Sequence, residues 1–247
     1  MPQISSTHLI LIACHAVYLG QTQAEARLDQ SWCLQTFQVG EPAFYIEHIQ
    51  AGISLAAQSP NSLLVFAGSQ TRREAGPLSE AQSYWFLAEQ SGWWGQTEVR
   101  NRTTTEEFSR DSFENLLFGI CRFREYAGDY PQRISAVSWK FKQERFDLHR
   151  QAIRFPADRF EFIGVNNPPD LESALRGERQ HSLIPFSQDP FGTGPVLAAK
   201  RHNRNPFHRQ HGYTTSCPEV ASLLNYAGPD SFPDTLPWEN TTGTPHR

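Results

Sequence analysis

The sequence predicts an α/β fold: a Rossmann-like, mainly parallel sheet flanked by helices, with an irregular C-terminal extension. Short β-rich runs alternate with helical patterns, and the first two runs are continuously apolar, as strands covered on both faces must be. After residue 170 the chain becomes rich in Pro, Gly, His and Arg. We therefore expect a Rossmann-like domain over residues 6–170. Residues 171–247 should form an extension that packs on the same domain, with an end that frays or wraps the surface.

Four β-rich runs are the predicted strands. The last two alternate polar and apolar residues more than the first two, which places them nearer an edge of the sheet. Single helices connect the runs, and such βαβ units are right-handed and give parallel strands. The predicted strands cover residues 8–13, 63–67, 134–138 and 160–165.

Helical patterns lie between these strands. Two of them open with a capping-box spacing, at Ser79 with Gln82 and at Asp111 with Glu114. The helix that begins near Asp111 should stop at Gly128, because glycine favours the left-handed conformation that ends helices. The predicted helices cover residues 42–57, 79–91, 111–127 and 141–155 and, in the extension, residues 168–180 and 218–227.

Charge and composition exclude several classes of protein. The 247 residues contain 22 Lys and Arg against 26 Asp and Glu, a net charge of −4, so the chain is no generally basic nucleic-acid binder. None of the four cysteines forms a CxxC pair, and the apolar run at residues 9–18 is too short to cross a bilayer. No basic segment of the kind that opens a signal peptide precedes this run. We expect a cytoplasmic protein that has neither a nucleic acid nor a membrane as a partner.

Polar and charged residues follow the predicted strands where these end. In an open parallel sheet, ligands bind outside the carboxyl ends of the strands. That rule selects the loops at residues 14–16, 68–73, 139–142 and 166–167. Solvated surface charge is the ordinary role of Arg and Lys, but several cations on neighbouring loops indicate an anion. The ligand-binding residues expected here are Gly68, Ser69, Gln70, Thr71, Arg72, Lys142 and Arg145.

Several common catalytic and nucleotide-binding motifs are absent. The chain has no GxGxxG after a strand, no GxxxxGK[ST], no HExxH and no GxSxG. This disfavours dinucleotide binding of the usual kind, P-loop hydrolysis, zinc-peptidase chemistry and α/β-hydrolase chemistry. We expect no metal site, and a metal-independent enzyme if the protein is one.

Three segments resemble one known family. Residues 66–69 read FAGS and residues 79–81 read SEA; residues 107–115 read EFSRDSFEN; and Lys142 stands three residues before Arg145. The set resembles the SanA/YdcF/ElyC-like family, also called domain of unknown function 218, where the last element has His in place of this lysine. The extension resembles soluble fungal-type members that end in "RN-P" and "CPE" stretches. The resemblance implies a Rossmann-like fold and a pocket for a nucleotide-like ligand such as S-adenosylmethionine.

The segment from Glu107 to Asn115 has two interpretations. In the first, Glu107, Ser112 and Asn115 hold ligand hydroxyls and Glu107 is the general base. In the second, Asp111 and Ser112 cap the following helix and Asn115 ties the loop. The resemblance favours the first. Glu80 is equally open, either as part of a helix start or as a group that faces the ligand.

Two further features carry alternatives. Cys14 is a small buried hydrophobe or a nucleophile with His15 as base; since strand neighbours point oppositely, we keep His15 alone as an acid–base candidate. His48 is expected to be a core histidine. The basic stretch at residues 200–211 is either a solvated loop or a lid that folds over the rim and adds cations.

The sequence therefore predicts a small-molecule enzyme that binds an anionic ligand, phosphorylated or nucleotide-like. The backbone amides of Gly68 and Ser69, with nearby cations, would neutralise the ligand, and the catalytic candidates are Glu107, His15 and Glu80. A hydrolase or a group transferase fits best. The alternatives are an S-adenosylmethionine-dependent methyltransferase, with Glu80 or Glu107 on the ribose, and a binding protein without catalysis.

Overall fold

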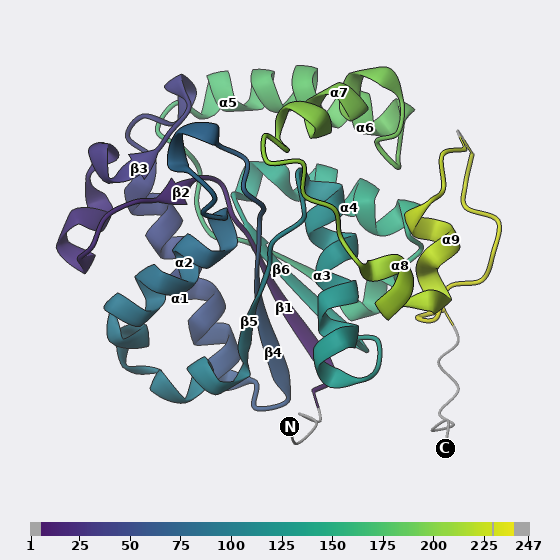
Figure 1. The fold of residues 1–247 in the computed structure, drawn as a ribbon, viewed down its shortest axis with the longest axis horizontal. Helices are drawn as coiled ribbons and strands as arrows, with labels where there is room; N and C mark the ends of the chain where they lie inside the picture. The colour runs from purple at the N-terminus through teal and green to yellow at the C-terminus, as the bar shows by residue number, and fades with distance from the viewer. Residues whose placement is uncertain (1–5, 229, 240–247) are drawn as a thin grey trace.

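A computed structural model describes residues 6–228 and 230–239 and has a parallel sheet at its centre (Figure 1). The five strands lie in the order β5-β4-β1-β6-β7, and every pairing between them is parallel. The α/β fold predicted from the sequence is therefore confirmed. The strands are β1 (His8–Ala13), β4 (Ser62–Ala67), β5 (Thr103–Glu106), β6 (Arg133–Ser138) and β7 (Phe160–Gly164).

Helices cover both faces of this sheet (Figure 1). Alternate residues of β1 point to opposite faces, so Ile10 and Ile12 pack toward α1 and α2, while Leu9 and Leu11 pack toward α3. On that second face α4 packs beside α3 and against β7. These helices are α1 (Pro42–Gln58), α2 (Glu80–Gln90), α3 (Ser112–Ala127) and α4 (Gln143–Ala152).

The predicted helix ends are largely confirmed. The Ser79 hydroxyl accepts a hydrogen bond from the Gln82 amide, and the Asp111 carboxylate accepts one from the Glu114 amide. Gly128 ends α3 with a φ of 84°, as predicted. The fourth helix is shorter than predicted, because a 3₁₀ turn, Lys140–Lys142, precedes it and the helix itself begins at Gln143.

The four predicted strands are confirmed, but β5 was missed. Its sequence, Thr103 to Glu106, is polar, and it occupies an edge where only one neighbour pairs with it. Edge position also explains the pattern of the last predicted run, since β7 forms the other edge and β6 lies beside it. A small antiparallel pair, β2 (Val17–Tyr18) with β3 (Trp32–Cys33), flanks the sheet.

The extension is more helical than its composition predicted. Helices α5, α6 and α7 lie across one end of the sheet, and α8 and α9 lie beside α3 (Figure 1). Tyr213, Cys217 and Trp238 from the extension share one hydrophobic core with α3. The elements are α5 (Leu171–Glu178), a π-helical turn (Arg179–Leu183), α6 (Ile184–Gln188), α7 (Pro195–Asn203), α8 (Tyr213–Ser216) and α9 (Ala221–Leu224).

Two observations concern the limits of the described chain. The end predicted to fray or wrap the surface is residues 228–247; in its described part Phe232, Leu236 and Trp238 are buried in the core, which corrects that prediction there, and residues 229 and 240–247 lie outside the residues that the structure describes. Across the described ranges, no helix combines the length and the apolar character that crossing a bilayer requires.

The turn after β4 is fixed by contacts with its neighbours. Gly68 donates its amide to the Glu106 carbonyl, and its carbonyl accepts from the Ala81 amide. A Cβ at Gly68 would lie 2.8 Å from Glu80 Oε2 and 3.0 Å from Cys14 Cβ. The position therefore needs a residue without a side chain.

Replacing Gly68 with Ala is expected to destabilise the protein by about 1–3 kcal/mol, because the new methyl group overlaps buried atoms that cannot move away. Gly177 is the matched control: it lies in α5, where an added Cβ meets nothing within 4 Å. Gly177→Ala should stabilise by about 0.5–1 kcal/mol through helix propensity. Urea unfolding monitored by circular dichroism measures both, and equal effects of the two changes would contradict the steric argument.

Candidate functional site

Four cations gather at the carboxyl ends of the strands, below the extension. We call them the cationic cluster: Arg72 from the loop after β4, Lys142 and Arg145 from the segment after β6, and Arg204 from the end of α7. Lys142 interacts electrostatically with Arg145 and Arg204, and Glu80 interacts with Arg72, Arg204 and Lys142. Loops far apart in sequence thus bring like charges together.

Lys142 is the centre of the cluster. Its Nζ lies 3.4 Å from Nδ1 of His15, and burial, followed by the charge of Arg145, lowers its pKa to about 7. Among the described residues Lys142 forms no ion pair, and its carboxylate neighbours Glu41 and Glu178 act on it only at a distance. The Lys142 side chain is half-buried, and a partly desolvated ammonium without a close counter-charge is unfavourable unless something else neutralises it.

His15 offers a hydrogen-bond donor to this site. Burial and then the charge of Lys142 lower its pKa well below the ordinary value, so the ring is neutral. While Lys142 is charged it can only donate, so in that state Nδ1 of His15 accepts and Nε2 carries the hydrogen. That Nε2 is buried and has no partner among the described residues. The imidazole is held by neighbouring rings, Trp139 at 6.1 Å and Tyr45 at 5.4 Å between centroids.

Two arginines complete the cluster on the sheet side. Arg145 forms an ion pair with Glu178 of α5 at 2.9 Å, and the two side chains are 11% and 8% exposed. The extension thus supplies the counter-charge of Arg145. Arg72 forms no ion pair in the described ranges, and its Nε is buried without a hydrogen bond. Arg72 is placed by the loop after β4, and Arg145 by the first turn of α4.

Glu80 and Thr71 lie beside the cluster and interact with each other. The Thr71 hydroxyl donates a hydrogen bond to Oε1 of Glu80, and burial raises the pKa of this carboxyl. Ser79, not Glu80, supplies the side-chain cap of α2. Glu80 is therefore a buried carboxyl at the cluster, and both predicted residues lie where the sequence placed them.

The predicted role of the Gly68 and Ser69 amides is wrong. Gly68 donates its amide to the Glu106 carbonyl and Ser69 donates to the Ser109 carbonyl, both at 3.0 Å, so neither is available to an anion. Gln70 also turns away, since its side-chain amide donates to the Pro77 carbonyl at 2.8 Å. The turn after β4 therefore forms hydrogen bonds within the protein, and these groups are not available to a ligand.

The prediction that Glu107 faces the same rim is also wrong. Its carboxylate accepts from the Thr105 hydroxyl at 2.9 Å and lies 3.6 Å from Arg209. These residues line a hollow of about 230 Å³ outside the edge strand β5, away from Lys142. The buried carboxyl of this loop is Glu106, which accepts from the Phe108 and Ser109 amides. Burial raises the pKa of Glu106 to about 7.

Ser112 and Asn115 belong to the start of α3. Ser112 lies with its hydroxyl 2.7 Å from Nε2 of His149, and Asn115 is buried in the first turn. Asp111 caps the helix, as the second interpretation of this segment proposed. The prediction that Ser112 and Asn115 bind the ligand is therefore corrected: within the described chain neither side chain forms a hydrogen bond with the cationic cluster, and Ser112 bonds to His149 instead.

Cys14 and His48 are core residues. Cys14 is buried at the end of β1, where burial raises the pKa of its thiol well above the ordinary value. A thiol held in this state is a poor nucleophile. His48 is buried, and its Nε2 lies 2.8 Å from the Asn166 side-chain oxygen. Burial lowers the pKa of His48 to about 3, so the ring is neutral.

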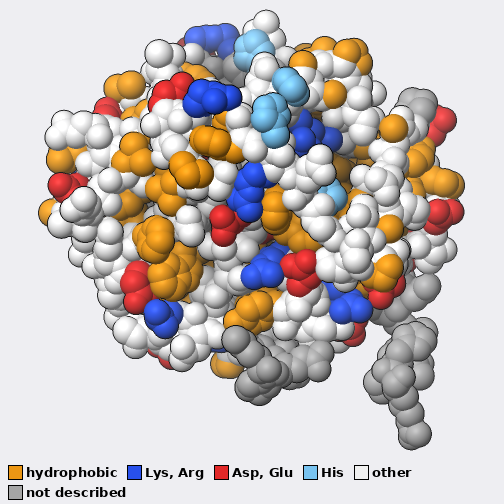
Figure 2. Space-filling view, in the orientation of Figure 1, with side chains coloured by type: hydrophobic (Ala, Val, Ile, Leu, Met, Phe, Trp, Pro, Cys, Tyr) orange, Lys and Arg blue, Asp and Glu red, His pale blue; other side chains and the backbone are white. Residues whose placement is uncertain are grey.

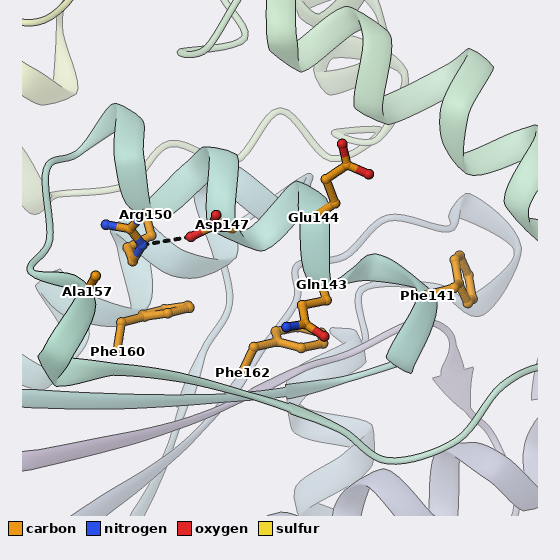
Figure 3. A pocket seen from close by; sticks show the side chains of 8 residues that line it. All are labelled: Phe141, Gln143, Glu144, Asp147, Arg150, Ala157, Phe160 and Phe162. Carbon is orange, nitrogen blue, oxygen red and sulfur yellow. Dashed lines mark hydrogen bonds and ion pairs between the residues drawn. The ribbon is translucent and has the colours of Figure 1, made fainter.

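A hollow of about 510 Å³ lies over β7, the edge strand at the opposite side of the sheet from β5 (Figure 3). Phe160 and Phe162 form its floor, and Asp147 is paired with Arg150 at 2.8 Å. Its charged groups are paired or exposed, whereas Lys142 of the cationic cluster is half-buried and forms no ion pair among the described residues. The described residues contain no group of three or more His, Cys, Asp or Glu arranged to hold a metal ion.

Sequence reasoning missed Glu178 and left the role of Arg204 open. Both come from the extension, whose α5 and α7 lie across the strand ends (Figure 1). Figure 2 shows basic and histidine side chains gathered on this upper part of the molecule. The basic composition of residues 200–211 was the available signal, and the lid interpretation of that stretch agrees with its position.

Comparison with known proteins gives one relationship. The chain is 30% identical over 259 residues to the uncharacterized protein YOR238W of Saccharomyces cerevisiae. The match covers 83% of this chain and 86% of the yeast protein. The chain belongs to the family of that yeast protein. No family model matches the sequence, and no solved structure matches it. The relationship carries no activity with it, so the function has to be inferred from the site.

Replacing Lys142 with Met should make the ligand-free protein more stable, by about 1–3 kcal/mol below pH 7, because it removes a half-buried charge that forms no ion pair among the described residues and lies near other cations. The lysine pKa falls from 10.5 in the unfolded chain to about 7 in the fold, so wild-type stability rises as the pH increases between these values. The advantage of Lys142→Met should therefore shrink toward pH 10. Urea unfolding in chloride buffers at pH 6 and pH 9.5 measures it.

Lys140→Met is the matched control, since Lys140 is exposed and lies in the same 3₁₀ turn. It should change stability little at either pH. A Lys142→Met protein that is less stable than wild type at pH 6 would show that the ammonium is well neutralised in the free protein.

Proposed function

We propose that the protein is an enzyme that binds a small phosphorylated or nucleotide-like anion at the carboxyl ends of the strands and hydrolyses it or transfers a group from it. The observation that carries the proposal is the half-buried Lys142 side chain, which lies among other cations and lacks an ion pair within the described chain. An anion at this position would supply the missing charge.

The donors around Lys142 suit a phosphate group. His15 presents Nε2–H, Lys142 presents its ammonium, and Arg72 has a buried Nε without a partner. A phosphate dianion has three terminal oxygens, so it can accept from several such donors at once. A carboxylate has two oxygens and one charge, and it would leave part of the donor set unused. The site therefore supports a dianion over a monoanion.

The same residues can move protons. With a pKa of about 7, Lys142 can be charged or neutral near neutral pH, and His15 lies 3.4 Å from it. Glu80 adds a carboxyl whose pKa is raised by burial. Proton transfer of this kind serves hydrolysis and group transfer. These properties favour an enzyme over a protein that only stores its ligand.

S-adenosylmethionine, the alternative ligand, fits the cluster less well. Its sulfonium and ammonium groups outweigh its carboxylate, so it carries a net positive charge near neutral pH. Four like charges at Arg72, Lys142, Arg145 and Arg204 would repel it. Of the carboxylates considered for the ribose, Glu80 already accepts from Thr71, and Glu107 lies at the edge of the sheet.

Binding of sulfate, inorganic phosphate and AMP should raise the thermal unfolding midpoint, and S-adenosylmethionine should not. Stabilisation by a ligand follows RT ln(1 + [L]/Kd), about 2.7 kcal/mol at a hundredfold excess over Kd. Lys142→Met should lose most of this shift, although its own ligand-free stability is not reduced. Lys140→Met should keep the full shift. Equal shifts in both variants, or none in wild type, would refute the proposal.

Sulfate binding should weaken as the pH rises above about 7, by roughly tenfold per pH unit, because the neutral Lys142 must take up a proton when the anion binds. Sulfate remains a dianion throughout this range, so the change reports the protein and not the ligand. Isothermal titration from pH 6 to pH 9 measures it. A flat profile would contradict the role of Lys142. Release of phosphate from AMP and from sugar phosphates, with and without EDTA, then tests catalysis.

A further inference from the structure

A segment of the extension is attached directly to the loops that form the site. We call it the arm, residues 195–209, which consists of α7 and the turn after it. Arg73, after β4, donates to the Pro206 carbonyl at 2.9 Å, and Arg204 donates to the Arg110 carbonyl at 3.0 Å. Arg209 lies 3.6 Å from Glu107. The arm thus spans the loops that follow β4 and β5.

Arg201 anchors the arm. Its Nε lies 2.6 Å from Asp111 and 3.3 Å from Glu114, and its Nη1 donates to the Phe191 carbonyl at 2.9 Å. The side chain is buried, and its guanidinium also lies over the Phe113 ring. Gly192 has a positive φ of 67°, and a Cβ there would collide with the Arg201 guanidinium. The backbone at Gly192 therefore has a conformation that leaves room for the Arg201 side chain.

The electrostatics of the anchor are strong. Burial alone would raise the pKa of Asp111, but the charge of Arg201 and the hydrogen bond it donates lower it to about 2. Both charges thus persist at every pH near neutrality, and the arm stays attached. Only strong acid would protonate Asp111 and remove the ion pair.

Arg204 lies almost one helical turn beyond Arg201, so both side chains emerge from one side of α7. Unlike Arg201, Arg204 forms no ion pair within the described chain; its guanidinium donates a hydrogen bond to the Arg110 carbonyl. It acts electrostatically on Lys142, Arg145 and Glu80. The arm therefore brings a cation toward two others, an arrangement that a dianion between them would stabilise.

We infer that Arg204 is a ligand-binding residue supplied by the arm, and that Arg201 is the positioning residue that holds it over the site through Asp111 and Glu114. This inference rests on the proposed function and extends it: the anion is closed in by the C-terminal extension. The site is then built from both parts of the chain. Loss of the Arg201 anchor would lower anion affinity without touching His15 or Lys142, whereas loss of the Arg209 contact at the far end of the arm would leave the affinity unchanged.

The test is sulfate binding by isothermal titration with full-length variants. Arg204→Met should weaken binding at least tenfold while leaving the thermal midpoint of the ligand-free protein unchanged or higher. Arg209→Met is the matched control, since it removes a cation of the same arm that faces Glu107. It should bind as wild type does. Wild-type affinity in Arg204→Met would overturn the inference.

The pH profile separates a contact with the ligand from a general loss of structure. Arg204 lowers the pKa of Lys142, so Arg204→Met should move the pH at which sulfate binding weakens upward from about 7. Arg201→Met should lose affinity and also expose the arm to hydrogen exchange, and Arg201→Lys should restore part of both. An unchanged pH profile in Arg204→Met would count against the contact. Absence of sulfate and phosphate binding in wild type would instead refute the proposed function.

Discussion

All strands of the sheet run in one direction, and this single constraint brings the candidate site together. Parallel pairing from β5 to β7 places every following loop at the same edge. His15 after β1, Arg72 after β4 and Lys142 after β6 therefore meet although they are far apart in sequence. The core on both faces holds the strand ends still, because Ile10 and Leu11 of one strand are buried on opposite sides.

The strand ends gather positive charge that the sheet itself does not neutralise. Folding normally pairs buried cations or keeps them in water. Here Arg145 is paired with Glu178 from the extension, whereas Lys142 is left beside a neutral histidine. A natural sequence that keeps such a residue trades stability for function, as active sites commonly do. The unneutralised lysine therefore distinguishes this edge from the hollow over β7, where Asp147 and Arg150 satisfy each other.

Most of the sheet could be predicted from the sequence, but only part of the candidate site could. Apolar runs identify buried strands such as β1 and β4 without ambiguity, whereas β5 is polar because it lies at an edge. Side-chain direction was harder to predict: Glu106 is buried and Glu107 points outward, a difference of one residue that no composition reveals. The backbone amides of Gly68 and Ser69 were assigned to a ligand because the sequence does not show that the Glu106 and Ser109 carbonyls accept from them.

The extension shows why local sequence patterns could not predict the whole candidate site. Its composition reads as irregular, yet Tyr213 and Trp238 are buried in the core beside α3, and Arg201 is buried between Asp111 and Glu114. Those contacts span about ninety residues of sequence, so only the folded chain brings the partners together. Because the same anchor that packs the extension also sets the position of Arg204, stability and the charge of the site are coupled in this protein. A change in the core contacts of the extension would therefore act on the site as well.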